Sequence, residues 1–213
     1  MVTTGFSKPY VAKYSNTGQT VTYSGAMKLG RGVSVSVEID TADDNNFYAD
    51  NVVEETETSQ FTSGTATITV DGLEPEAAVL VYGITGEKTV TVDETPVKFQ
   101  TYGDKMNPPY LGFGCVRRTM MKGVTQYWPY ILPKIKINLP SEEMATQEDS
   151  IDWQTQELNA MIQRDDTEDH NWKYITEEGM DTEAEAEAAV QAFLNYQAQT
   201  LSVQNTQQEP KEE

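Results

Sequence analysis

The residue types that most often carry catalysis are sparse in this chain of 213 residues. His170 is its one histidine and Cys115 its one cysteine. His170 stands between Asp169 and Asn171, a setting typical of an exposed loop rather than of a proton-transfer site. Cys115 lies in an apolar segment with no recognisable general base, so we expect a small packed side chain rather than a nucleophile. We therefore expect no catalytic residues and no enzyme activity.

Acidic pairs and glycine-rich segments are the candidates for ligand sites. Asp43-Asp44 and Asp165-Asp166 have oxygen ligands for a hard cation, but they lack the alternating ligand spacing and the glycine of a calcium loop. Gly30-Arg31-Gly32 and Gly112-Phe113-Gly114 lack the helix and the lysine that usually follow in a phosphate-binding loop. One cysteine excludes both an internal disulfide and a cysteine-based zinc cage. We expect solvated acidic loops, no metal and no cofactor.

The overall charge excludes several classes of partner. The formal net charge is -19 at pH 7, and the isoelectric point is near 4.3. Such a chain is unsuited to neutralising nucleic-acid phosphates or to docking on an anionic membrane, although the same charge also serves solubility. We find no signal peptide and no apolar run long enough to span a bilayer, so we expect folding in a reducing cytoplasm.

Charge is also segregated along the chain. Lys105–Ser141 holds six basic residues and no acidic one, whereas Glu142–Glu187 holds sixteen acids and two basic residues. Complementary potentials steer association and set register. This partition therefore predicts surfaces that meet other copies of the chain. The inter-subunit candidates from the basic stretch are Arg117, Arg118, Lys122, Lys134 and Lys136.

The first hundred residues are typical of strands. Apolar residues alternate with polar ones in Val33–Ile39, around Val21 and Tyr23, and in Ala66–Val70, which predicts strands with one face on a core. Thr41–Phe61 is long, polar and acidic, and indicates either a projecting hairpin or a mobile loop.

A short helix and a hairpin are predicted next. Pro75 suits the first turn of a helix and Gly83 its end. Val90–Val92 and Val97–Phe99 have strand character, and Asp93-Glu94 suits the turn between them.

A second hairpin is predicted from Tyr110–Met121 and Gln126–Asn138, with Gly123 supplying the turn conformation. Pro129 and Pro133 cannot donate ladder hydrogen bonds. The second strand is therefore expected either to lie at a sheet edge or to begin late.

The last third combines an extended segment with a helix. Leu158, Ala160 and Ile162 lie on one side of the predicted strand Ser150–Arg164. Thr182 and Glu185 have the spacing of a capping box. Beyond Gln197 the composition predicts a disordered tail. The expected apolar stripe of the helix is Ala186, Ala189, Val190, Phe193 and Leu194.

Six segments between Lys8 and Thr176 form a recognisable series by their order and spacing. They are Phe47–Glu54, Thr62–Ile68, Gly72–Glu76, Gly112–Gly114, Ile131–Ile135 and Ser150–Leu158. Together they resemble the major tail tube proteins of long-tailed phages of Gram-positive bacteria, the phi13-like family. Order and spacing, rather than any single motif, carry the resemblance.

The resemblance implies a mainly β tail tube fold, in which two packed antiparallel sheets form a sandwich or barrel with a flanking short helix. Residues 1–180 would form this domain, with 41–61 projecting, followed by a C-terminal helix at 181–196 and a tail at 197–213. Family members form hexameric rings that stack into a tube, through which genomic DNA passes without specific binding. They have no catalytic residues.

The implied setting is the virion tail, assembled in the host cytoplasm, with other tail proteins such as the tape measure, distal tail and terminator proteins as partners. The loop 41–61 would reach the next ring. An acidic lining would repel DNA over about a Debye length, roughly 8 Å in physiological salt. The inter-ring candidates are Phe47, Tyr48, Asp50, Val52, Val53 and Glu54.

Two alternatives stay open. Another ring-forming tail protein, or a secretion-system tube subunit, would share the fold. An extracellular β-sandwich adhesin would share the strands and the acidity, but it should also carry an export signal.

Overall fold

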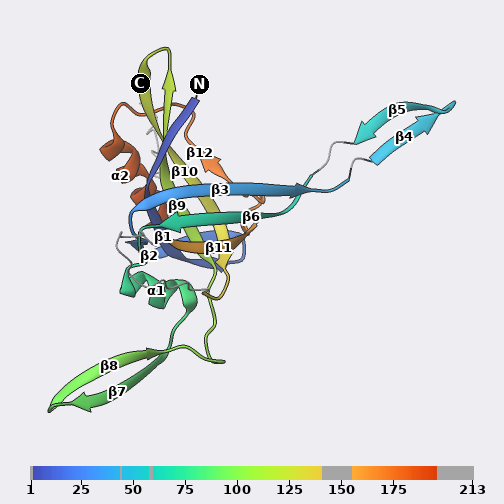
Figure 1. Cartoon of the computed structure of the whole chain (residues 1–213). Helices are drawn as coiled ribbons and strands as arrows, with labels where there is room; N and C mark the ends of the chain where they lie inside the picture. Colours follow the sequence, from blue (N-terminus) through green and yellow to red (C-terminus); the bar gives the residue numbers. More distant parts are fainter. Residues whose placement is uncertain (1, 44, 58–59, 141–154, 196–213) are drawn as a thin grey trace, which may run out of the picture.

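We describe residues 2–43, 45–57, 60–140 and 155–195 of a computed structural model of the chain. This part is mainly antiparallel β structure with two helices (Figure 1), which confirms the predicted fold class at that level. The strands are β1 (Val2–Thr17), β2 (Thr20–Lys28), β3 (Gly32–Thr41), β4 (Asn45–Ala49), β5 (Val52–Glu57), β6 (Phe61–Val70), β7 (Gly86–Val92), β8 (Thr95–Thr101), β9 (Leu111–Met121), β10 (Val124–Ile137), β11 (Gln156–Gln163) and β12 (Tyr174–Ile175), and the helices are α1 (Pro75–Tyr82) and α2 (Glu183–Leu194).

One large sheet supplies both layers of the domain. Its strands run in the order β2-β1-β9-β10-β11-β6-β3, and β12 pairs with β10. Strand β10 connects the layers, because Val124–Leu132 pair with β9 and Lys134–Ile137 pair with β11. Strands β3, β6 and β11 then cross over the β1, β9 and β10 layer (Figure 1). The two expected layers are thus halves of one folded sheet.

The central core fills the space between these halves. It combines Ile68 of β6 and Leu158 of β11 with Phe113 of β9 and Ile135 of β10. The predicted inward residues of β11, Leu158, Ala160 and Ile162, are buried as expected. Helix α1 closes one end of this core with Val81 and neighbouring residues, and it begins at Pro75 and ends at a left-handed Gly83, as predicted.

A second core lies on the opposite face of β1 and β9, under α2. The capping box of Thr182 and Glu185 starts this helix, as predicted, and Ala186, Val190 and Leu194 are buried against the strands. Strand β9 approaches closely because two of its residues are glycines. A Cβ on Gly112 would lie 2.5 Å from Cε1 of Tyr23, and one on Gly114 would lie 2.7 Å from Cγ1 of Val190.

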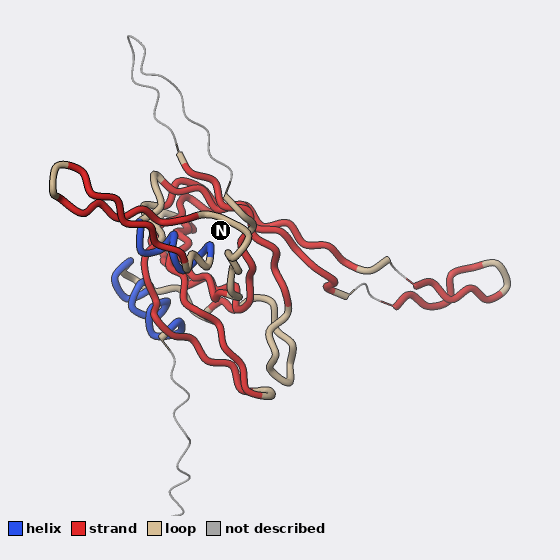
Figure 2. The backbone as a smooth tube through the Cα atoms, turned by 90° about the horizontal axis from the view of Figure 1, so that it is seen from below, coloured by secondary structure: helices blue, strands red, loops and turns tan. Residues whose placement is uncertain are grey.

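Two-residue turns close three of the hairpins. The turn residues Asp50-Asn51, Asp93-Glu94 and Lys122-Gly123 all have positive φ, between 47° and 83°, as type I′ turns require. The turn predicted at Gly123 is confirmed. Segment 41–61 forms the β4–β5 hairpin, the first of the two forms expected for it. Hairpins β4–β5 and β7–β8 extend well away from the sheet (Figures 1 and 2).

The prediction that the strand carrying Pro129 and Pro133, here β10, lies at a sheet edge or begins late is wrong. This strand begins at Val124 and lies between β9 and β11 rather than at an edge. Both prolines lie outside the ladders on the far side from β9. Pro129 precedes the first pair with β12, Tyr130 with Ile175, and Pro133 precedes the first pair with β11 and lies within a bulge. The backbone N–H groups that Pro129 and Pro133 lack therefore remove no ladder hydrogen bond on that side.

Some predictions fall outside the described residues. These are the start of the extended segment at 150–154 and the tail at 197–213. Within the described part, neither helix is long and apolar enough to cross a bilayer.

Gly112→Ala tests the packing of β9 against the second core. The Tyr23 ring is rigid and buried, and its hydroxyl donates to the carbonyl oxygen of Pro133 at 3.0 Å. It cannot move aside cheaply, so we expect a loss of about 1–3 kcal/mol in the free energy of unfolding. Urea unfolding measures this loss. The matched control is Gly103→Ala, whose Cβ meets nothing within 4 Å. Equal stability of the two variants would contradict this account.

Candidate assembly surfaces

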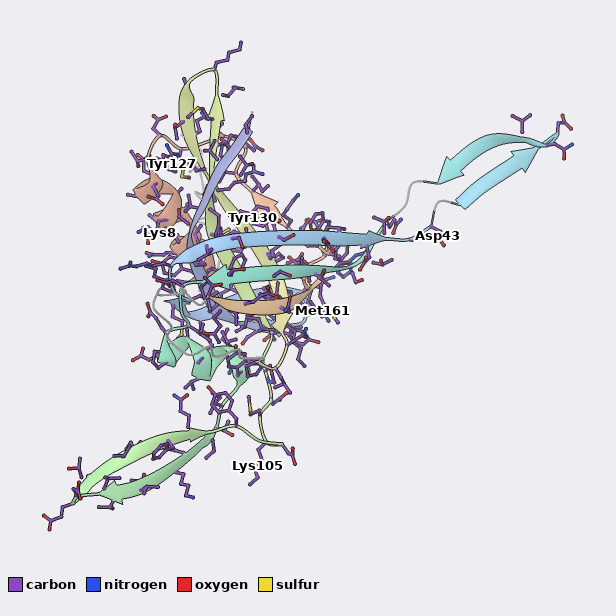
Figure 3. All side chains as sticks on the ribbon, viewed as in Figure 1. Lys8, Asp43, Lys105, Tyr127, Tyr130 and Met161 are labelled. Atoms are coloured by element: carbon purple, nitrogen blue, oxygen red, sulfur yellow. The ribbon has the colours of Figure 1, made fainter. Side chains whose placement is uncertain are left out.

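The β4–β5 hairpin carries all six residues predicted for inter-ring contact. Asp50 lies in its turn and Val52 opens β5, both exposed. The other four lie on β4 or β5, and their side chains are outside the described set: Phe47, Tyr48, Val53 and Glu54. Asp43, at the root of the hairpin, is exposed and points away from the domain (Figure 3).

The β7–β8 hairpin exposes one apolar face. Val90 pairs with Val97 and Lys88 with Phe99 across the strands, so Val90, Val92, Val97 and Phe99 share a side, and all four are exposed. An isolated two-stranded hairpin is marginal in water. Its apolar face therefore favours contact with another surface. The alternation of Val90, Val92, Val97 and Phe99 indicated a strand, but could not show that nothing in the domain covers it.

The β9–β10 tip, residues 117–126, combines exposed apolar and basic side chains. Met121 pairs with Val124 beside the turn, and Val2 of β1 pairs with Met120. All four are exposed, as are Arg118 and Lys122. No acidic residue occurs within 117–126 or Val2–Gly5. Two predicted inter-subunit cations therefore lie on an exposed, apolar end of the sheet.

Arg117, at the base of the tip, lines a cavity of about 400 Å³ between β1 and β3. Phe6, Val35, Cys115 and Tyr130 line it with apolar surface. Among the described side chains, the buried Nε of Arg117 has no hydrogen-bond partner. Cys115 is buried, as predicted, and burial raises the pKa of its thiol.

The last two predicted cations are partly buried and contact other parts of the chain. Nζ of Lys134 lies 2.7 Å from Oδ2 of Asp166 and 4.9 Å from the ring centroid of Tyr110. Nζ of Lys136 lies 5.6 Å from the same centroid. Sequence alone groups Lys134 and Lys136 with Arg118 and Lys122, whereas the fold separates them into a partly buried pair and an exposed pair.

The expectation of a solvated loop at Asp165-Asp166 is wrong. Asp165 is only 2% exposed. Its carboxylate accepts from the backbone N–H of Asn171 at 2.9 Å, the hydroxyl of Tyr174 at 2.7 Å and the hydroxyl of Thr167 at 2.6 Å. These bonds satisfy a buried charge and hold the loop in place. No sequence signal separates such an anchor from an exposed acid, because its partners come from the folded loop.

Neither the histidine nor the acids form a metal centre in the described residues. His170 is exposed, as predicted, with a φ of 51°. No group of three or more His, Cys, Asp or Glu side chains in the described ranges could hold a metal ion.

Strands β3, β6 and β11 present a polar sheet face to solvent. Thr67 pairs with Ser36 on one side and with Asn159 on the other, and its hydroxyl donates to Oδ1 of Asn159 at 3.0 Å. Met161 marks this face in Figure 3. The set contains two acids and no Lys or Arg: Ser34, Ser36, Glu38, Thr65, Thr67, Thr69, Glu157, Asn159 and Met161.

No known protein-family model matches the sequence, and no curated protein sequence matches it.

The Lys134–Asp166 pair should make stability depend on pH. The hydrogen bond from Lys134 lowers the pKa of the Asp166 carboxyl. A lowered pKa stabilises the fold above the unfolded pKa of about 3.9, and this stabilisation is lost as pH falls through the lower, folded value. After allowance for solvent screening, Asp166→Asn should cost about 1–2 kcal/mol at pH 7, and less at about pH 2.

Urea unfolding across this pH range measures the difference. The control is Glu168→Gln, an exposed neighbour. A cost of Asp166→Asn that stays constant from pH 7 to the acid limit would show that the charge of Asp166 is not what stabilises the loop.

Proposed function

We propose that this chain is the major tail tube subunit of a long-tailed phage, forming hexameric rings that stack into a conduit for genomic DNA. The observation that carries the proposal is the pair of long hairpins that leave the domain, one of them with an exposed apolar face. Such hairpins are suited to an assembly, because they gain stability only when another surface covers them. The six-segment resemblance supports the same role.

The tail tube fold is part of the proposal. The halves β2-β1-β9-β10 and β11-β6-β3 correspond to its two packed sheets, and α1 to its flanking helix. The β4–β5 hairpin is proposed to reach the next ring through Phe47, Tyr48, Asp50, Val52, Val53 and Glu54. Strands β2 and β3 end the strand order, and joining such ends between neighbouring subunits would close the sheets into a ring without free edges.

We assign the channel wall to the polar sheet face. Ser and Thr side chains form most of this face, with Glu38 and Glu157 among them and no basic residue. A conduit must not bind the DNA that passes through it tightly. Each Lys or Arg contact with a phosphate would release counterions and add affinity. Helix α2 covers the opposite side of the domain, so this assignment places α2 on the outside of the tube.

The proposed role needs no catalytic group, metal or cofactor. DNA passes without specific binding, and the partners are further copies of the chain and other tail proteins, such as the tape measure, distal tail and terminator proteins. The subunit would assemble in the host cytoplasm and remain in the virion tail.

Negative-stain electron microscopy of the purified full chain tests the proposal. We expect rings, or tubes of stacked rings with a central channel, at high protein concentration, because exposed apolar hairpin surface is buried on stacking. A protein that stays monomeric at about 1 mM, with no tubes in lysates of producing cells, would refute the proposal.

Introducing two lysines on the polar sheet face tests the assignment of this face to the channel wall. Tubes of Ser36→Lys/Thr65→Lys should retain a short DNA duplex that wild-type tubes release, and retention should fall as salt rises from about 50 to 200 mM. The matched control is Ala188→Lys/Ala192→Lys, which adds two lysines to exposed positions of α2. Filter retention of labelled duplex is the readout. Equal retention by both variants would place the polar sheet face outside the channel.

A further inference from the structure

We propose that the β7–β8 hairpin of one copy packs against the β9–β10 tip of a second copy, head to tail. This contact goes beyond the proposed function, because a head-to-tail chain of subunits does not require hexameric rings. It also differs from the contact assigned to the β4–β5 hairpin.

The two surfaces lie at opposite ends of the subunit. The β7–β8 hairpin leaves the end that carries α1, whereas the β9–β10 turn lies at the far end, beside the N-terminus (Figure 1). Contact between different patches on two copies is heterologous. It repeats from subunit to subunit and builds a closed ring where the rotation closes, or an open filament where it does not.

Both surfaces expose apolar side chains that the subunit itself leaves uncovered. The hairpin offers Val90, Val92, Val97 and Phe99, and the tip offers Val2, Met120, Met121 and Val124. Covering either set with a partner removes apolar surface from water, and such burial is the main driving force of association. Methionine adapts its shape to an aromatic neighbour such as Phe99.

Complementary charge on the two surfaces identifies the partner as a second copy of the chain. The hairpin ends in Asp93-Glu94, and the tip carries Arg118 and Lys122 with no acid among its own residues 117–126. Docking the acidic turn beside the basic tip aligns opposite charges, which selects orientation and register. Two hairpins docked turn to turn would instead bring four carboxylates together.

Two of these charged residues, Glu94 and Lys122, adopt a backbone conformation that their residue types rarely adopt. Asp93 and Glu94 have φ of 47° and 64°, and Lys122 has φ of 50°. Asn-Gly is the preferred pair for such a turn, because glycine and asparagine tolerate the left-handed region best. Aspartate also tolerates this region, but the longer side chains of Glu94 and Lys122 cost conformational energy there, and this cost points to a contact that uses their charges.

Charge reversal with compensation tests the contact. Sedimentation equilibrium of the full chain should show that Asp93→Lys/Glu94→Lys lowers the association constant at least about tenfold, and that Arg118→Glu/Lys122→Asp does the same. A mixture of the two variants, or the quadruple variant, should regain association. Recovery excludes a merely structural role, since misfolding in one hairpin is not repaired by a change in another.

A second variant removes the charges of the turn without disrupting the hairpin. Asp93→Asn/Glu94→Gly removes both charges while installing the preferred turn pair, so the hairpin is retained and association should still weaken. The matched control is Glu168→Lys/Asp169→Lys, which reverses another exposed pair of neighbouring acids and should leave association unchanged. Wild-type association should also weaken with added salt.

The outcomes separate this contact from the proposed function. Ring or tube assembly that is unaffected by the hairpin and tip variants, or is lost without recovery in the compensated pair, would overturn the contact and leave the tube proposal standing. Head-to-tail filaments without rings would support the contact and refute the tube. A wild-type chain that remains monomeric at about 1 mM would overturn both.

Discussion

Strand β9 is packed on both of its faces, and the arrangement of the other elements depends on this. Residues 111–116 are all buried, with Phe113 in the central core and Val116 in the core under α2. Gly112 and Gly114 let Tyr23, Val190 and Leu194 approach the strand more closely than any side chain would allow. The resulting three layers, from the β3–β6–β11 half through the β9 layer to α2, hold the sheet in its folded shape.

This packing leaves little apolar surface to stabilise the parts outside the layers. Hairpins β4–β5 and β7–β8 extend beyond both cores (Figures 1 and 2), and the exposed face of Phe99 and its neighbours has no cover within the described subunit. A two-stranded hairpin of this kind is marginal alone. The domain therefore combines a sandwich packed around its own cores with hairpin extensions that those cores do not cover.

Charged residues divide in the same way between the packed domain and its exposed ends. Asp165 is buried and the Lys134–Asp166 pair is partly buried, and together they fix the loop before β12 to Tyr14 and Tyr174. Arg118 and Lys122 lie at an exposed end. Buried charges with hydrogen-bond partners favour one loop conformation, whereas exposed charges contribute little to folding and are free to steer association. A count of acids and bases along the chain does not distinguish these roles.

The sequence by itself determined the local structure. Alternation predicted β3 and β6, Pro75 and Gly83 predicted α1, and Thr182 with Glu185 predicted the start of α2, because each signal acts within a few residues of the chain. Only the tertiary structure decided that β10 is central in spite of Pro129 and Pro133, that Asp165 is buried, and that Lys134 is partly buried. These properties depend on partners distant in sequence, such as β11 beside β10 and Tyr14 beside Asp166, and a local pattern cannot specify them.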